Sequence, residues 1–156
     1  MRAYQLYLIE DEFATHYFGR EWMFFQLFQE HEYFSGELKT IIGKQIQFIT
    51  KEIPSFRLHQ YIKEQVRLDK DFQMKNDAYY LKIGKNSKAK LEIFDRSIKL
   101  FASGNYEAET TFFEILRKNE ASFLAIDLEH ERYGWLKPIK EFSSKKYVGN
   151  QQANIV

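Results

Sequence analysis

The sequence predicts a single α/β or α+β domain in which a mixed β-sheet of five to six strands packs against helices. The length of 156 residues suits one domain with one substantial core. Apolar residues recur with a helical period up to about residue 68 and alternate with period two from residue 78. The order of strand, helices, strands, helix and strands is typical of one sheet with helices against it. We expect this domain to span residues 1–142, followed by a polar, flexible tail over residues 143–156.

The amino-terminal half predicts one strand and three helices. Residues 3–9 form a short run rich in Tyr, Leu and Ile, which is typical of a strand. Asp11 is a suitable N-cap for a helix that begins near Glu12, and Gly19 is a point at which that helix can break or kink. Pro54 separates the second and third helices, because it disfavours helical backbone in the residue before it. The predicted helices cover residues 12–28, 37–50 and 56–68.

Period-two alternation predicts strands in the carboxyl-terminal half. They cover residues 78–83, 89–94, 98–102, 123–127 and 132–136. A helix capped by Asn105 and extending to Lys118 lies between the third and fourth of these strands. Because a helix joins them, we expect these two strands to run parallel to each other through a right-handed crossover.

Composition excludes several classes of protein. The chain has no cysteine, so it has neither a disulfide framework nor a Cys-based zinc site. A hydrophobic content of 44% and a net charge of +1 exclude a disordered chain and make a strongly basic polymer-binding protein a poor fit. No apolar run approaches the roughly 18–20 residues of a membrane span, and the first residues lack a secretory signal. We therefore expect a cytoplasmic protein without membrane contact.

The motifs of common enzymes are absent or incomplete. The glycines of residues 36–44 (GELKTIIGK) are separated by six residues, whereas a phosphate-binding loop has four. The His-Glu pairs that begin at His31 and His130 lack the second histidine of a zinc helix motif. Asp127, at the carboxyl end of a predicted strand, is the best single candidate for a catalytic acid, and no partner for it is evident. We expect no enzyme activity, cofactor, metal or small-molecule substrate. An enzyme built around Asp127 or a histidine is the least favoured hypothesis.

Charge is distributed unevenly along the chain. Residues 1–36 are acidic overall, whereas residues 75–99 hold seven Lys or Arg against three acids. The lysines around the predicted turn lie beside two tyrosines: Lys82, Lys85, Lys88 and Lys90 beside Tyr79 and Tyr80. These lysines either protect an edge strand from unwanted pairing or form a nucleic-acid-binding module in which Lys82–Lys90 contacts phosphates and the tyrosines stack on bases. This module is the alternative to the function considered below.

Aromatic residues are concentrated near the amino terminus. They occupy nine of the 22 positions over residues 13–34. In a continuous helix several of these rings would share one side (Phe13, Tyr17, Phe24 and Phe28), whereas others would point away. Either one aromatic side is a binding surface, or Gly19 divides the segment into two helices that each bury their own face.

Four stretches of the chain resemble the sporulation inhibitor of replication (SirA) family of Bacillus-type bacteria. They are YLIEDEFATHYFGRE at residues 7–21, KQIQFIT at 44–50, ASGNYEAETTFFEILRK at 102–118 and FLAIDLEHERYGWLKPIKE at 123–141. They occur in order along the chain, and together they span residues 7–141. Strings of this length are specific, because they match no generic nucleotide or metal motif.

The resemblance implies a non-enzymatic regulator. Proteins of this family bind the amino-terminal domain of the replication initiator DnaA and keep it from acting at the chromosome origin as a cell commits to sporulation. The resemblance implies no cofactor and no direct contact with nucleic acid. The DnaA-contacting positions that it transfers are Phe13 and Tyr17 of F-A-x-H-Y, Gln45 and Phe48 of K-Q-I-Q-[YF], and Pro138 of Y-G-W-L-x-P. Phe48 stands where the family pattern favours Tyr, so a hydroxyl is missing there.

Helix geometry is compatible with these transferred positions. Phe13 and Tyr17 are four residues apart, and Gln45 and Phe48 are three apart, so each pair shares one helix face. We therefore expect two neighbouring helices to present one patch. For Pro138, support of the fold after Trp135 is the alternative to partner contact.

Overall fold

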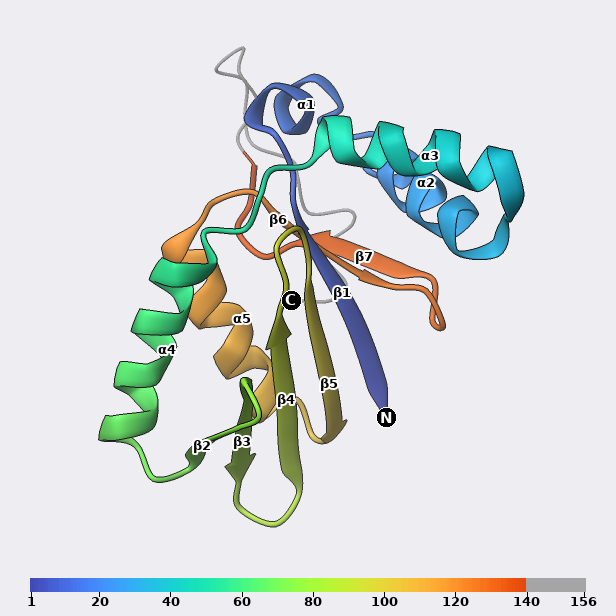
Figure 1. Ribbon diagram of the computed structural model, residues 1–156. Helices are drawn as coiled ribbons and strands as arrows, with labels where there is room; N and C mark the ends of the chain where they lie inside the picture. The colour runs from blue at the N-terminus through green and yellow to red at the C-terminus, as the bar shows by residue number, and fades with distance from the viewer. Residues whose placement is uncertain (140–156) are drawn as a thin grey trace.

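A computed structural model of the chain describes residues 1–139, which form one sheet with helices against it (Figure 1). The strands are β1 (Arg2–Leu8), β2 (Phe72–Lys75), β3 (Ala78–Ile83), β4 (Ser87–Ile93), β5 (Ile98–Gly104), β6 (Phe123–Asp127) and β7 (Arg132–Trp135). Within the described residues the sheet has seven strands in the order β2-β3-β4-β5-β1-β6-β7. The predicted fold class is confirmed. The predicted tail over residues 143–156 lies outside the described residues.

The sheet differs from the prediction in two details. Every neighbouring pair of strands is antiparallel, so the sheet is not mixed. The sheet also gains β2, which sequence analysis missed because only Phe72 of its four residues is buried, too short a run to show alternation. Such a short segment forms a strand because β3 supplies a hydrogen-bonding neighbour.

The position of β1 could not be predicted from local sequence. The strand lies between β5 and β6 and is antiparallel to both, so β5 and β6 run in the same direction, as predicted, without being neighbours. Helix α5 (Glu107–Asn119) connects them. The first strand of the chain therefore completes the centre of the sheet, which only long-range pairing decides.

The predicted helix over residues 12–28 is wrong as one continuous element. It is divided into α1 (Asp11–His16) and α2 (Trp22–Tyr33). Gly19 lies between them with φ of +84°, a left-handed conformation that favours glycine and that a helix cannot contain. The division at Gly19 is therefore confirmed, but only α2 buries aromatic rings, whereas Phe13 and Tyr17 stay partly exposed. The remaining helices, α3 (Gly36–Ile49) and α4 (Ser55–Leu68), lie close to the predicted ranges.

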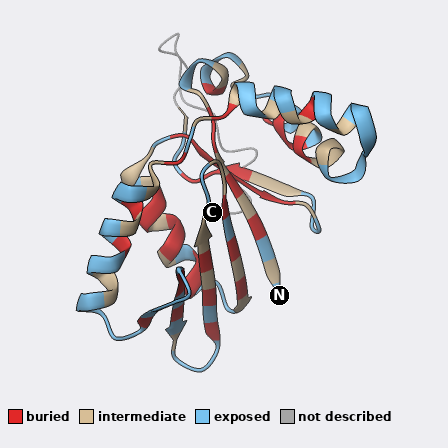
Figure 2. Ribbon diagram, viewed as in Figure 1, coloured by how far each residue is buried: buried red, intermediate tan, exposed pale blue. Residues whose placement is uncertain are grey.

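Helices cover both faces of the sheet, but not to the same extent (Figure 1). Helices α4 and α5 pack against one face in a core that includes Leu6, Leu91 and Phe112. Helices α1 to α3 form a second cluster with β6 and β7 on the opposite face. All five residues of β6 are buried, because this strand has a helical layer on either side. In β3 to β5 buried and exposed residues alternate, and the face turned away from α5 is open (Figure 2).

Candidate protein-binding groove

Helices α1, α2 and α3 border an apolar groove of about 600 Å³, which we call the helical groove. Phe13 of α1 and Tyr17 just after it, Met23 and Leu27 of α2, and Ile41, Gln45 and Phe48 of α3 line it. Four of the five positions transferred from the family resemblance are thus gathered at one place. The patch that two helices were expected to share is bordered by three.

Backbone hydrogen bonds fix α1 beside the end of α3. The amide of Glu10 donates to the carbonyl of Ile49 at 2.8 Å, and the amide of Lys51 donates to the carbonyl of Leu8 at 2.7 Å. These bonds join the chain that leaves β1 to the chain that leaves α3. As a result, the rings of Phe13 and Phe48 meet edge to face, with centroids 5.4 Å apart.

The wall formed by α2 is held by one buried carboxylate and by aromatic packing. An oxygen of Glu21 accepts hydrogen bonds from the backbone amide of Gly19 and from the indole nitrogen of Trp135, both at 3.1 Å. Phe28 is stacked on Tyr7 of β1, with ring centroids 4.0 Å apart. The turn at Gly19 and strand β7 thereby set the direction of α2 and the width of the groove.

The rim of the groove exposes apolar side chains to an unusual degree. The exposed fraction is 72% for Phe48 and 46% for Ile41. Tyr17 packs edge to face on the buried Phe24, and the guanidinium of Arg20 lies 5.0 Å from the Tyr17 ring centroid. Exposed aromatic and aliphatic side chains around a concave surface mark sites where proteins bind one another.

Pro138 is the transferred position that lies outside this groove. It is exposed and is not among the residues that line the helical groove. Its neighbour Ile139 packs against the same hydrophobic cluster as Phe13 and Tyr17. Partner contact and support of the fold after Trp135 thus both stay predictions for Pro138.

Sequence analysis did not place Met23 and Leu27 in the site. These residues are four apart on α2, so they share a helix face. Sequence analysis grouped only the aromatic residues of this segment, so it left both of these non-aromatic residues out. The four-residue spacing of apolar side chains, aromatic or not, is the signal that would have included them.

Asp127 has partners, contrary to its appearance in the sequence. Its carboxylate is fully buried and accepts hydrogen bonds from Arg132 at 2.9 Å and from His130 at 2.8 Å. Burial opposes ionisation of this carboxyl, but the hydrogen bonds from Arg132 and His130 outweigh it and hold the pKa below its usual value. All three residues belong to the β6–β7 hairpin, so this arrangement stabilises a turn.

Neither a metal site nor a membrane-spanning helix is found in residues 1–139. No group of three His, Cys, Asp or Glu side chains is placed there to hold a metal ion. In the same part of the chain, no helix has the length and hydropathy to cross a bilayer.

His59 is hydrogen-bonded to the Tyr79 hydroxyl, with 2.6 Å between the His59 Nδ1 atom and the hydroxyl oxygen. Burial and, to a smaller extent, the charge of Lys63 lower the pKa of His59.

The structure is that of a small α+β protein with an apolar, aromatic groove between helices. The chain belongs to the SirA family. The family model described as "Sporulation inhibitor of replication protein SirA" matches residues 2–140. A relative from Bacillus subtilis (strain 168), named "Sporulation inhibitor of replication protein SirA", is 44% identical over 144 residues, which cover 90% of this chain and 96% of the relative. The family resemblance seen in the sequence is thereby confirmed, and the family's name is that of a regulatory inhibitor.

Proposed function

We propose that this chain inhibits initiation of DNA replication during sporulation by binding the amino-terminal domain of DnaA in the helical groove. The observation that supports this most directly is that Phe13, Tyr17, Gln45 and Phe48, which come from two separate motifs, line one exposed groove. The names of the family and of the relative connect the fold with inhibition of replication in sporulation. A cytoplasmic location belongs to the same proposal.

The groove suits an inhibitor that acts by occupying a partner's surface. A volume of about 600 Å³ accommodates a ridge of side chains, not a whole domain. A stable interface buries about 800 Å² on each partner, so contact has to extend from the groove over its rim. The exposed rings at the rim supply the apolar anchors that dominate the free energy of such interfaces. The proposal needs no cofactor and no chemical step.

Phe48 offers the cleanest test, because it is so exposed that its loss leaves the core intact. Phe48→Ala should weaken binding to the separated amino-terminal domain of DnaA by about 30-fold, the equivalent of about 2 kcal/mol. The matched control is Phe56→Ala on α4, since Phe56 is 75% exposed and Phe48 is 72% exposed. Isothermal titration calorimetry should show an affinity change within twofold for this control.

Phe13→Ala and Tyr17→Ala serve as further arms of the same titration. We expect both to abolish binding while the circular dichroism spectrum stays native. Because both side chains are half-buried against the groove-side cluster, their melting temperatures must be measured alongside. Equal affinity losses for Phe48→Ala and Phe56→Ala, or no binding by the unmodified chain, would contradict the proposal.

A further inference from the structure

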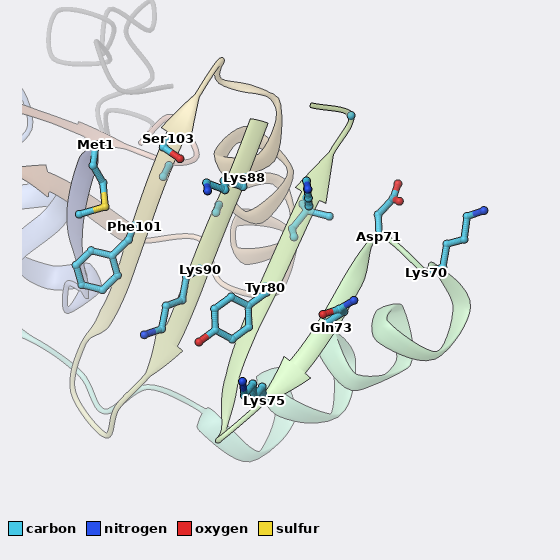
Figure 3. Close-up of a pocket in the computed structure, with 15 residues that line it drawn as sticks. Met1, Lys70, Asp71, Gln73, Lys75, Tyr80, Lys88, Lys90, Phe101 and Ser103 are labelled. Atoms are coloured by element: carbon cyan, nitrogen blue, oxygen red, sulfur yellow. The ribbon is translucent and has the colours of Figure 1, made fainter. Parts of the chain in front are cut away.

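The open face of the sheet is a second surface with its own chemistry. Residues of β3, β4 and β5 that point away from α5 line a hollow of about 1090 Å³ (Figure 3). This hollow and the helical groove have no lining residue in common. We call it the lysine face and define it by Tyr80, Lys82, Lys88, Lys90 and Phe101.

The register of the sheet arranges this face in rows. Tyr80 is opposite Lys90, and Lys90 is opposite Phe101, so a lysine lies between two aromatic rings across three adjacent strands. The Lys90 ammonium is 5.8 Å from the Tyr80 ring centroid and 6.0 Å from that of Phe101 (Figure 3). In the next row, Lys82 is opposite Lys88 and Lys88 is opposite Ser103.

The rings of Tyr80 and Phe101 lie too far apart to stack on each other. Residues two strands apart in a sheet are separated by roughly 10 Å, so Tyr80 and Phe101 do not stack on each other. Tyr80 is exposed and Phe101 is partly exposed, so a planar group can reach both rings. Lys75 also lines the hollow and adds positive charge, while Glu92 forms an ion pair with Lys90 at 3.5 Å. A partly exposed pair of this kind is weak and leaves the lysine available to a stronger anion.

Protection of an edge strand does not explain these lysines. Strand β3 pairs with both β2 and β4, and β4 pairs with both β3 and β5. Lys82, Lys88 and Lys90 therefore lie on interior strands of the sheet, where no edge needs protection. Their positive charge beside an exposed ring and a partly exposed ring needs another explanation.

We propose that the lysine face binds single-stranded nucleic acid, with bases stacked on Tyr80 and Phe101 and a phosphate held by Lys90. Aromatic platforms in a positively charged groove are the general means by which proteins hold single strands without reading their sequence. The complementary charge is the phosphate backbone, and the planar groups are the bases. A base pair within a duplex cannot offer its face to a ring that lies on a sheet, so a duplex binds more weakly.

The test is fluorescence anisotropy of the full chain with a labelled oligothymidylate of about 12 nucleotides, titrated at several salt concentrations. We expect affinity to fall with salt, by about 0.7 logarithmic units per tenfold salt increase for each phosphate contacted. Tyr80→Leu combined with Phe101→Leu keeps apolar area on the face but removes the stacking rings. This variant should bind at least tenfold more weakly with an unchanged salt slope.

A second pair of variants tests the charge. Lys88→Gln combined with Lys90→Gln should weaken binding and reduce the salt slope by about 1 to 1.5. The matched control removes two exposed lysines from α4 and α5, Lys63→Gln combined with Lys118→Gln, and should bind like the unmodified chain. An oligouridylate of equal length distinguishes RNA from DNA as the ligand. Tighter binding of the oligouridylate identifies RNA, and tighter binding of the oligothymidylate identifies DNA.

Three results would overturn the proposal. The first is no binding of either oligonucleotide at about 50 mM salt. The second is equal or tighter binding of a duplex, or equal competition by polyglutamate, which would identify the face as a general polyanion or acidic-peptide surface. The third is a loss of affinity in the lysine variant without any loss in the leucine variant, because bases would then not stack on the rings.

Discussion

The helical groove and the lysine face are two exposed surfaces of one small domain, and they are built in opposite ways. The groove gathers residues from three helices whose relative positions depend on hydrogen bonds at Glu10, Lys51 and Glu21. The lysine face lies on neighbouring strands, whose side chains alternate by backbone geometry alone. A surface on paired strands is therefore set by local pattern and register, whereas a surface between helices is set by the contacts that orient them.

The two surfaces also differ in the forces available to a ligand. The groove is lined mainly by apolar and aromatic side chains, so binding there should depend weakly on salt. The lysine face combines ammonium groups with rings, so binding there should weaken as salt is added. Salt dependence thus distinguishes ligands of the two surfaces without any substitution.

The largest expected effect comes from Phe28→Ala on the groove side. Phe28 is buried and stacked on Tyr7, so its removal leaves a cavity and should lower the free energy of unfolding by about 3–5 kcal/mol. Urea denaturation measures this loss. At low temperature, where the variant stays folded, DnaA-domain binding should fall more than oligonucleotide binding. Equal losses at both surfaces would show that they do not behave independently.

A smaller effect is expected from Gly104→Ala at the end of β5. Gly104 has φ of +82°, and an added Cβ would lie 1.8 Å from the carbonyl oxygen of Asn86. Strain and the clash together should lower the free energy of unfolding by about 2–4 kcal/mol. Gly84→Ala is the matched control, because Gly84 has φ of +61° but nothing within 4 Å of an added Cβ.

The difference between these two glycine variants in thermal unfolding isolates the clash from the backbone strain. Gly84→Ala should lose only about 1 kcal/mol. If the two variants melt at the same temperature, the close approach to Asn86 contributes nothing to the stability of the sheet.

The smallest effect is expected from Asp127→Asn in the β6–β7 hairpin, on which α2 packs. The pKa of Asp127 is lower in the folded protein than its usual value, which holds in the unfolded chain. The ionised carboxylate therefore stabilises the fold fully at pH values above that usual pKa. This stabilisation is lost as pH falls through the lowered pKa. Asp127→Asn should cost about 1–3 kcal/mol at neutral pH, because Arg132 and His130 lose a charged acceptor and the amide keeps only one accepting oxygen of the two.

Urea denaturation at neutral pH and at several pH values below about 4 checks this assignment. The Asp127→Asn protein should lose less stability on acidification than the unmodified chain. Parallel pH profiles for the two proteins would show that Asp127 is not the group responsible.

Most elements were predicted because their patterns are local. The alternation of residues 78–83 and the apolar face of the helix after Asn105 reappear in β3 and α5 with nearly the same bounds. Strand β2 was missed because a single buried residue makes no alternating pattern. Helices α1 and α2 were predicted as one helix because the spacing of apolar residues does not reveal the left-handed conformation of Gly19. Local physics thus fixes an element's type more reliably than its ends.

The sequence by itself determined the fold class, the exclusion of disulfides and Cys-based metal sites, the family, and the candidate positions in two motifs far apart in the chain. Only the tertiary structure decided that β1 completes the centre of the sheet and that Phe13 and Phe48 meet in one groove. It also placed Lys82, Lys88 and Lys90 on interior strands. The physical reason is that patterning depends on neighbours within a few residues, whereas pairing and docking join residues that the chain separates by tens of positions.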